Sequence, residues 1–156
     1  MRYPKLFSEG TIGNLKLKNR VVMPAMGNML ATAEGEVSDH QIAYFEERAK
    51  GGVGLIITEC TSVEYILGKS GPTHPRADDD KFIPMLFRLA NAAHKYGTKI
   101  FMQLHHAGRE SNSSLTGGRQ LVAPSPIACT VVGEMPRELT KEEIKDLVNR
   151  FVMGAF

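Results

Sequence analysis

The stretch Val53-Gly54-Leu55-Ile56-Ile57-Thr58-Glu59 decides the fold of this chain. It has the length of a β-strand, and its apolar residues follow one another without alternating with polar ones. That pattern is typical of a strand covered on both faces. Helix signals stand before and after it, so the sequence predicts a parallel sheet covered by helices.

The segment before this strand is predicted to be a helix. Ser38 and Gln41 have the spacing of a capping box. Gly51-Gly52 supplies a left-handed stop directly before the strand. The apolar residues recur at helical spacing: Ile42, Phe45 and Ala49.

A second helix and a third strand follow. The helix is predicted to begin near Asp80, to accept Pro84 in its first turn and to end at Gly97. Its apolar face consists of Met85, Leu86, Leu89, Ala92 and Ala93. The run Lys99–Leu104 is the predicted third strand.

Upstream, the run Val21-Val22-Met23 is the predicted first strand, covered on both faces and ended by Pro24. Before it, Thr11–Lys18 is predicted to form a small hairpin with Gly13-Asn14 as its turn.

Downstream, the segment from His105 to Leu139 shows little periodicity, and connections of that length are commonly functional. Thr140 and Glu143 then form a second capping box, which opens a helix with an apolar stripe. No stop signal precedes Phe156, so the chain is predicted to be cut from a longer one. A terminal helix with a frayed end is the alternative.

The order strand, helix, strand, helix, strand, helix requires parallel strands with right-handed crossovers. A doubly wound sheet and part of a (β/α)8 barrel both fit this order. The leading hairpin favours the barrel, because it can plug the bottom of a barrel whereas an open sheet has no need of one. We therefore expect an α/β fold in which residues 1–156 form the N-terminal portion of a TIM barrel, about three β/α units plus a hairpin.

Composition excludes several function classes. Hydrophobic residues make up 42% of the chain and charged residues 23%, as in a globular domain. Nineteen basic and seventeen acidic side chains leave a net charge of +2, which gives no footprint for nucleic acid or an anionic membrane. No apolar run could span a bilayer and no secretory signal opens the chain. Two cysteines form no disulfide framework, which favours a cytoplasmic location.

Three motifs fail on inspection. The glycines of Gly51–Gly54 precede a strand, whereas a dinucleotide fingerprint follows one. Gly68-Lys69-Ser70 ends like a phosphate loop, but Val63 stands where the loop needs glycine. His105 and His106 are neighbours that would point to opposite faces of a strand, so they cannot share a metal ion. We expect no metal site.

Three segments at strand ends carry chemistry, because barrel enzymes place their sites there. They are Leu17–Met26, Gly52–Glu59 and Gln103-Leu104-His105-His106-Ala107-Gly108-Arg109, and Ala123-Pro124-Ser125 and Leu139–Ile144 follow in register. Together they resemble the old yellow enzyme family. The similarity is greatest to its branch of 2,4-dienoyl-CoA reductase, 2-enoate reductases and trimethylamine dehydrogenase.

The resemblance implies an FMN-dependent oxidoreductase and assigns residues to FMN. Pro24, Ala25, Met26 and Gly27 match the stretch that lies against the flavin, where little side-chain bulk allows a flat approach. Cys60 matches the small residue that approaches its ring, although a lone cysteine is more often a small buried hydrophobe. Gln103 matches the amide that bonds the pyrimidine side; an amide both donates and accepts, and such contacts tune the cofactor.

Two further residues are weaker candidates. His106 and Arg109 match the family's Gln-Leu-x-His-x-Gly-Arg stretch and are placed at the active-site rim, with packing and loop anchoring as their alternatives. Gly27 stands where some members carry a flavin-modulating cysteine. The family's carbonyl-binding pair and tyrosine proton donor belong beyond Phe156, so the catalytic residues are unknown.

We therefore expect an ene-reductase that passes hydride from NAD(P)H through FMN to the activated C=C bond of an α,β-unsaturated carbonyl compound. The alternatives are an amine dehydrogenase or demethylase of the same branch, and a non-catalytic remnant if the chain truly ends at Phe156. On its own this fragment is expected to be inactive. Long members of the branch add a 4Fe-4S cluster after the barrel. The substrate is a small molecule of unspecified identity, the choice between NADH and NADPH is open, and so is a homo-oligomeric state.

Overall fold

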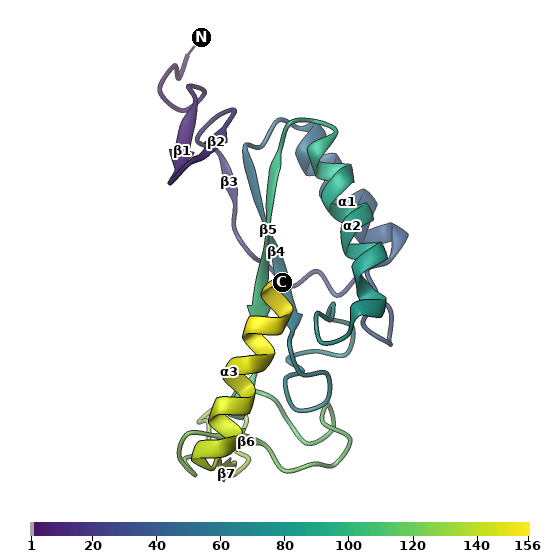
Figure 1. Cartoon of the computed structure of the whole chain (residues 1–156), viewed down its shortest axis with the longest axis vertical. Helices are drawn as coiled ribbons and strands as arrows, with labels where there is room; N and C mark the ends of the chain where they lie inside the picture. The colour runs from purple at the N-terminus through teal and green to yellow at the C-terminus, as the bar shows by residue number, and fades with distance from the viewer. Residues whose placement is uncertain (1) are drawn as a thin grey trace.

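In the computed structural model, which describes residues 2–156, a parallel three-stranded sheet stands at the centre (Figure 1). The strand order is β3 (Val22–Met23), β4 (Leu55–Ser62), β5 (Lys99–His105). Helices α1 (Asp39–Lys50) and α2 (Ile83–His94) connect these strands and lie together on one face of the sheet. The predicted succession of β/α units is confirmed.

The helix caps form largely as the sequence predicts. The Ser38 side chain accepts the Gln41 backbone N–H at the start of α1. The reciprocal half of the predicted capping box is wrong, because the Gln41 side chain turns inward to Glu59. Gly51 keeps helical backbone angles, and the left-handed residue is Gly52, with φ of 99°.

The core lies between the sheet and the two helices. A fully buried Phe45 packs there with Ile56 of β4 and Leu89 of α2. The predicted apolar faces of both helices supply half of the other residues of this core. A short 3-10 helix, η1 (Asp80–Phe82), leads into α2 and keeps Pro84 in the first turn.

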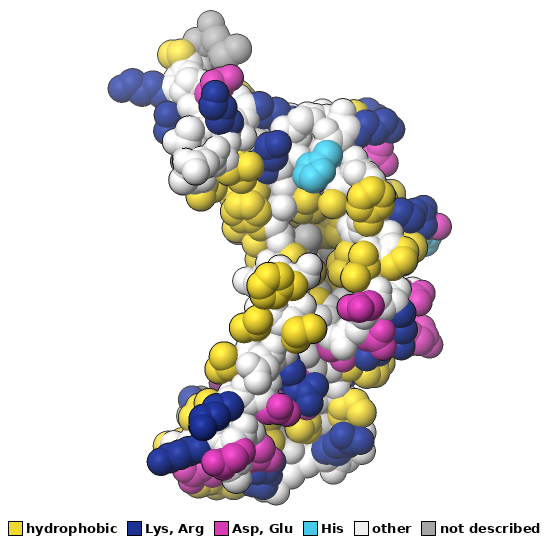
Figure 2. Space-filling view, in the orientation of Figure 1, with side chains coloured by type: hydrophobic (Ala, Val, Ile, Leu, Met, Phe, Trp, Pro, Cys, Tyr) yellow, Lys and Arg dark blue, Asp and Glu magenta, His cyan; other side chains and the backbone are white. Residues whose placement is uncertain are grey.

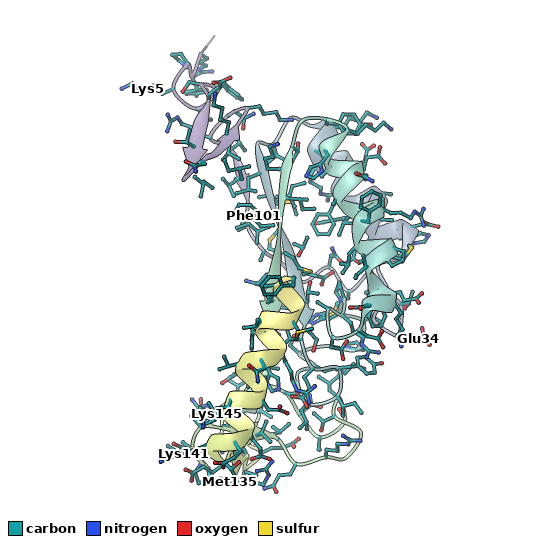
Figure 3. The ribbon with its side chains drawn as sticks, viewed as in Figure 1. Lys5, Glu34, Phe101, Met135, Lys141 and Lys145 are labelled. Carbon is teal, nitrogen blue, oxygen red and sulfur yellow. The ribbon has the colours of Figure 1, made fainter. Side chains whose placement is uncertain are left out.

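The other face of the sheet is open. Ile57 and Phe101 are opposite each other on β4 and β5, one residue out of phase with the core residue Ile56, so they belong to this face. Phe101, labelled in Figure 3, is 40% exposed, and Val22 of β3 is 42% exposed. The expectation that Val21–Met23 is covered on both faces is therefore wrong for this chain, because no element within residues 2–156 covers Val22 and Phe101 on the second face.

The termini flank the sheet. The hairpin consists of β1 (Gly10–Ile12) and β2 (Leu15–Leu17), with Gly13 at φ of 53° in its turn, as predicted. At the other end of the chain, α3 (Lys141–Ala155) begins with the complete Thr140–Glu143 capping box and runs toward the end of β5 (Figure 1). Figure 2 shows hydrophobic side chains gathered along the inner curve between the hairpin, the sheet and α3.

The long connection contains structure that its composition does not reveal. It includes a 3-10 turn, η2 (Gly108–Glu110), and two short parallel strands, β6 (Val122–Ala123) and β7 (Arg137–Glu138). Beside α3 this region borders a groove of about 730 Å³, lined largely by apolar side chains.

Candidate functional site

Two predicted residues meet at the carboxyl ends of β4 and β5. The pairing of these strands shifts by one residue between Ile57 and Cys60, which is a β-bulge. The bulge brings Cys60 opposite Gln103, and the Cys60 thiol donates to the Gln103 side-chain oxygen over 3.4 Å. Thr58 fills the gap in the ladder by accepting the Gln103 backbone N–H at 3.3 Å.

The segment that follows β3 lies at the same edge of the sheet. Strand β3 is parallel to β4 and pairs with its first residues, with Met23 opposite Ile56, so Pro24–Gly27 leaves the sheet there and runs on beside β4 until Asn28 reaches Glu59. Met26 is 54% exposed and Gly27 is exposed as well. A methyl group at Gly27 would meet only ordinary contacts, the nearest being His74 Nε2 at 3.7 Å, so the fold itself does not require glycine here.

A buried carboxylate lies between this segment and helix α1. Glu59 is 0% exposed, and one of its oxygens accepts the backbone N–H groups of Asn28 at 2.9 Å and Met29 at 3.4 Å. Its other oxygen accepts the side-chain amide of Gln41 from α1. Burial raises the pKa of the Glu59 carboxyl, and these three hydrogen bonds oppose the rise.

Two histidines of this region have a buried Nε2 atom; the His74 side chain is buried and that of His105 is half-buried. His74 Nδ1 is 2.7 Å from the Ser70 hydroxyl, and its Nε2 is 3.9 Å from the Glu59 carboxylate. His105, two residues after Gln103 on β5, also has a buried Nε2, and neither Nε2 has a hydrogen-bond partner among the described residues. Burial lowers the pKa of both imidazoles, which favours their neutral forms.

The two weaker candidates form hydrogen bonds with residues other than Cys60 and Gln103. His106 Nε2 is 3.2 Å from the Glu64 carboxylate, and His106 Nδ1 accepts the Gly108 N–H at 3.1 Å. The hydrogen bond from His106 lowers the pKa of Glu64. Arg109 donates to the Ile127 carbonyl at 3.2 Å and so ties down the long connection. Both side chains also line the groove beside α3.

Sequence reasoning missed Glu59, His74 and Gln41 as members of this region. A signal for Glu59 was present: a carboxylate that closes an otherwise apolar strand has to find donors. Nothing in the sequence pointed to His74, which reaches the region from the loop between β4 and η1.

The structure also bears on metals and membranes. Within residues 2–156 no three His, Cys, Asp or Glu side chains lie close enough together to hold a metal ion. Among the helices described, none has the length and apolar character needed to cross a bilayer.

Comparison with known proteins identifies the family. The model of the NADH:flavin oxidoreductase / NADH oxidase family matches residues 5–156. An NADH oxidase from Thermoanaerobacter brockii is 52% identical over 153 residues, which are 98% of this chain and 24% of that protein. The chain therefore spans about a quarter of that relative's length.

Solved structures agree. A complex of 2-naphthoyl-CoA reductase superimposes with a TM-score of 0.91 at 28% identity, over 98% of this chain and 25% of that one. An old yellow enzyme homologue from Zymomonas mobilis gives 0.86 at 30% identity, over 97% and 44%. The β/α units of this chain are part of the TIM barrel of such proteins, and the chain belongs to the NADH:flavin oxidoreductase / NADH oxidase family, the family of the old yellow enzymes.

Proposed function

We propose that the protein containing this chain is an FMN-dependent reductase that uses NAD(P)H to reduce the activated C=C bond of a small α,β-unsaturated carbonyl compound. Family membership supports the flavin and the nicotinamide, and the relatives named above include an oxidase of NADH and a reductase of an aromatic acyl-CoA. The observation that carries the proposal is the pairing of Cys60 with Gln103 toward the carboxyl ends of β4 and β5.

The residues at this edge fit a flavin. The Gln103 side chain offers both a donor and an acceptor, as the alternating C=O and N–H groups of a flavin pyrimidine require. Cys60 is small enough to let a flat ring approach the end of β4. Ala25 and Gly27 add little bulk beside the exposed Met26. When bound, FMN would supply the hydride chemistry, while these residues bind and orient it.

The open face of the sheet gives the ring an apolar wall. Phe101, two residues before Gln103, and Ile57 line that face below the two polar side chains. An apolar wall with a few placed polar groups is the usual composition of a cofactor site. We place the groups that bind the substrate carbonyl and deliver the proton on barrel strands outside residues 1–156.

The test is to purify the full-length protein and to record its visible absorption. We expect a flavin spectrum that bleaches on anaerobic addition of NADH or NADPH and recovers on addition of an enone. A protein that binds no flavin would overturn the proposal and favour a non-catalytic role. If no enone restores the flavin spectrum, but a methylated amine bleaches the spectrum of the oxidised protein, the result would favour amine oxidation. An iron assay of the same sample tests for the cluster of the longer members.

A further inference from the structure

We propose that Glu59 is a positioning residue that holds the segment Gly27–Met29 in the shape required beside the flavin. This inference rests on the proposed function. Glu59 reaches no substrate or cofactor, because its side chain is fully buried. It acts through the hydrogen bonds that it accepts from the backbone N–H groups of Asn28 and Met29.

The backbone that Glu59 holds is strained. Met29 has a φ of 55°, and no other residue except glycine has a positive φ in the part of the chain described. Residues other than glycine, asparagine and aspartate rarely adopt this left-handed conformation, because the Cβ atom then crowds the backbone. Such a conformation persists only where the surroundings over-determine it, and it is common near active sites.

The surroundings of Met29 supply several restraints. The Thr73 hydroxyl donates to the Met29 carbonyl at 2.9 Å. The Asn28 side chain accepts the Leu30 N–H at 3.0 Å, forming a local turn. The Met29 side chain packs over Gly71, where a methyl group would lie 2.8 Å from its Cε. Among the described residues, Glu59 is the side chain that accepts the Asn28 and Met29 N–H groups, and it comes from the sheet.

Successive side chains of a strand point to opposite faces, and the β-bulge determines which residues of β4 face which side. At the bulge, Cys60 turns to the open face beside Gln103, and the preceding residue Glu59 turns into the layer behind it. Gln41 of α1 then braces the carboxylate from the helix side. The same two residues of β4 therefore place a side chain at the proposed flavin site and fix the segment that borders it.

The experiment uses two substitutions of Glu59 that reduce its side-chain acceptor oxygens from two to one and to none. Glu59→Gln keeps one acceptor oxygen without the charge, and Glu59→Met keeps the length of the side chain but removes both oxygens. Glu46→Met is the matched control, because Glu46 is on α1 and pairs with Lys95 and Tyr96 at the surface. Amide hydrogen exchange at residues 28 and 29, the FMN dissociation constant and the visible circular dichroism of bound FMN are measured in the full-length protein.

We expect exchange at these two amides to rise by about tenfold or more in Glu59→Met, the factor that matches loss of one hydrogen bond to a charged group. Glu59→Gln should give a smaller rise, and Glu46→Met none. FMN binding should weaken in the same order, with an altered circular dichroism. Adding Met29→Gly to Glu59→Met should restore much of the FMN affinity, because glycine adopts a positive φ without strain.

Unchanged exchange in either folded variant of Glu59 would overturn the proposal. So would faster exchange with unchanged FMN affinity and circular dichroism, since Glu59 would then have a purely structural role. If Glu59→Met does not fold, Glu59→Gln decides on the same criteria. If the wild-type protein binds no FMN, the proposed function fails, whereas the exchange data still judge whether Glu59 holds the segment.

Discussion

The side-chain amide of Gln41, on α1, donates a hydrogen bond to the buried carboxylate of Glu59 in the second half of β4. The contact joins the helix layer to the strand end at which the proposed flavin site lies. It also explains why a glutamine with no access to solvent is tolerated in the first turn of an otherwise ordinary amphipathic helix.

Replacing Gln41 with leucine should destabilise the protein. The substitution keeps an apolar body in the core but leaves one oxygen of the buried Glu59 without its donor. Loss of a partner from a buried polar group costs about 1–3 kcal/mol. Urea unfolding of the full-length protein should show this loss, while His40→Leu, at the exposed neighbouring position, should change the free energy of unfolding by less than about 0.5 kcal/mol.

Replacing Gln103 with leucine should weaken FMN binding without unfolding the protein. The Gln103 side chain is exposed, and within residues 2–156 its one hydrogen bond is the bond that it accepts from the Cys60 thiol. Losing one or two hydrogen bonds to the ring should raise the FMN dissociation constant by about tenfold. Fluorescence titration with FMN measures the change, and Gln120→Leu in the long connection is the control. Equal affinities for the two variants would remove Gln103 from the site.

Gly54→Ala should be strongly destabilising for a steric reason. A methyl group at Gly54 would lie 2.6 Å from the backbone oxygen of Asn19, which cannot move freely because its own side chain bonds Gly52 and Val21. Overpacking of this kind costs about 1–3 kcal/mol. A fall in melting temperature measures it. Gly10→Ala, whose nearest new contact would be 3.4 Å away on a side chain, should cause little change.

The stability of the protein should depend on the protonation of Glu59. Its pKa is raised in the folded state above the ordinary value of 4.5, so the folded protein holds this proton more tightly than the unfolded chain does. The contribution of the protonated Glu59 carboxyl to stability is complete below pH 4.5 and is lost as the pH rises through the folded-state pKa. The free energy of unfolding of the wild type, minus that of Glu59→Gln, should therefore fall over this range.

The same comparison separates the pH-dependent contribution of Glu59 to stability from that of the neighbouring His74. His74, from the loop after β4, has a lowered pKa, so its contribution is present above 6.5 and is lost as the pH falls through the folded-state value. His74 occurs in both proteins, and its contribution cancels in the difference to a first approximation. A difference that does not vary with pH would show that Glu59 has the same pKa in the folded and unfolded states.

Local signals in the sequence determined much of this architecture. The caps at Ser38 and Thr140, the hairpin turn at Gly13 and the apolar spacing along α1 and α2 act over a few residues, and each element begins close to where its signal predicts. The apolar run Val53–Glu59 likewise predicts a buried strand, although the observed strand starts at Leu55 and continues to Ser62.

Only the tertiary structure decided the arrangement at the strand ends. The bulge in β4 arises from pairing with β5, and it alone determines that Glu59 faces the helices while Cys60 faces Gln103. The β6–β7 pair is equally invisible in sequence, because two-residue strands carry no periodicity. Burial, register and the strain at Met29 depend on which distant segments meet, and propensities over a few residues cannot encode those contacts.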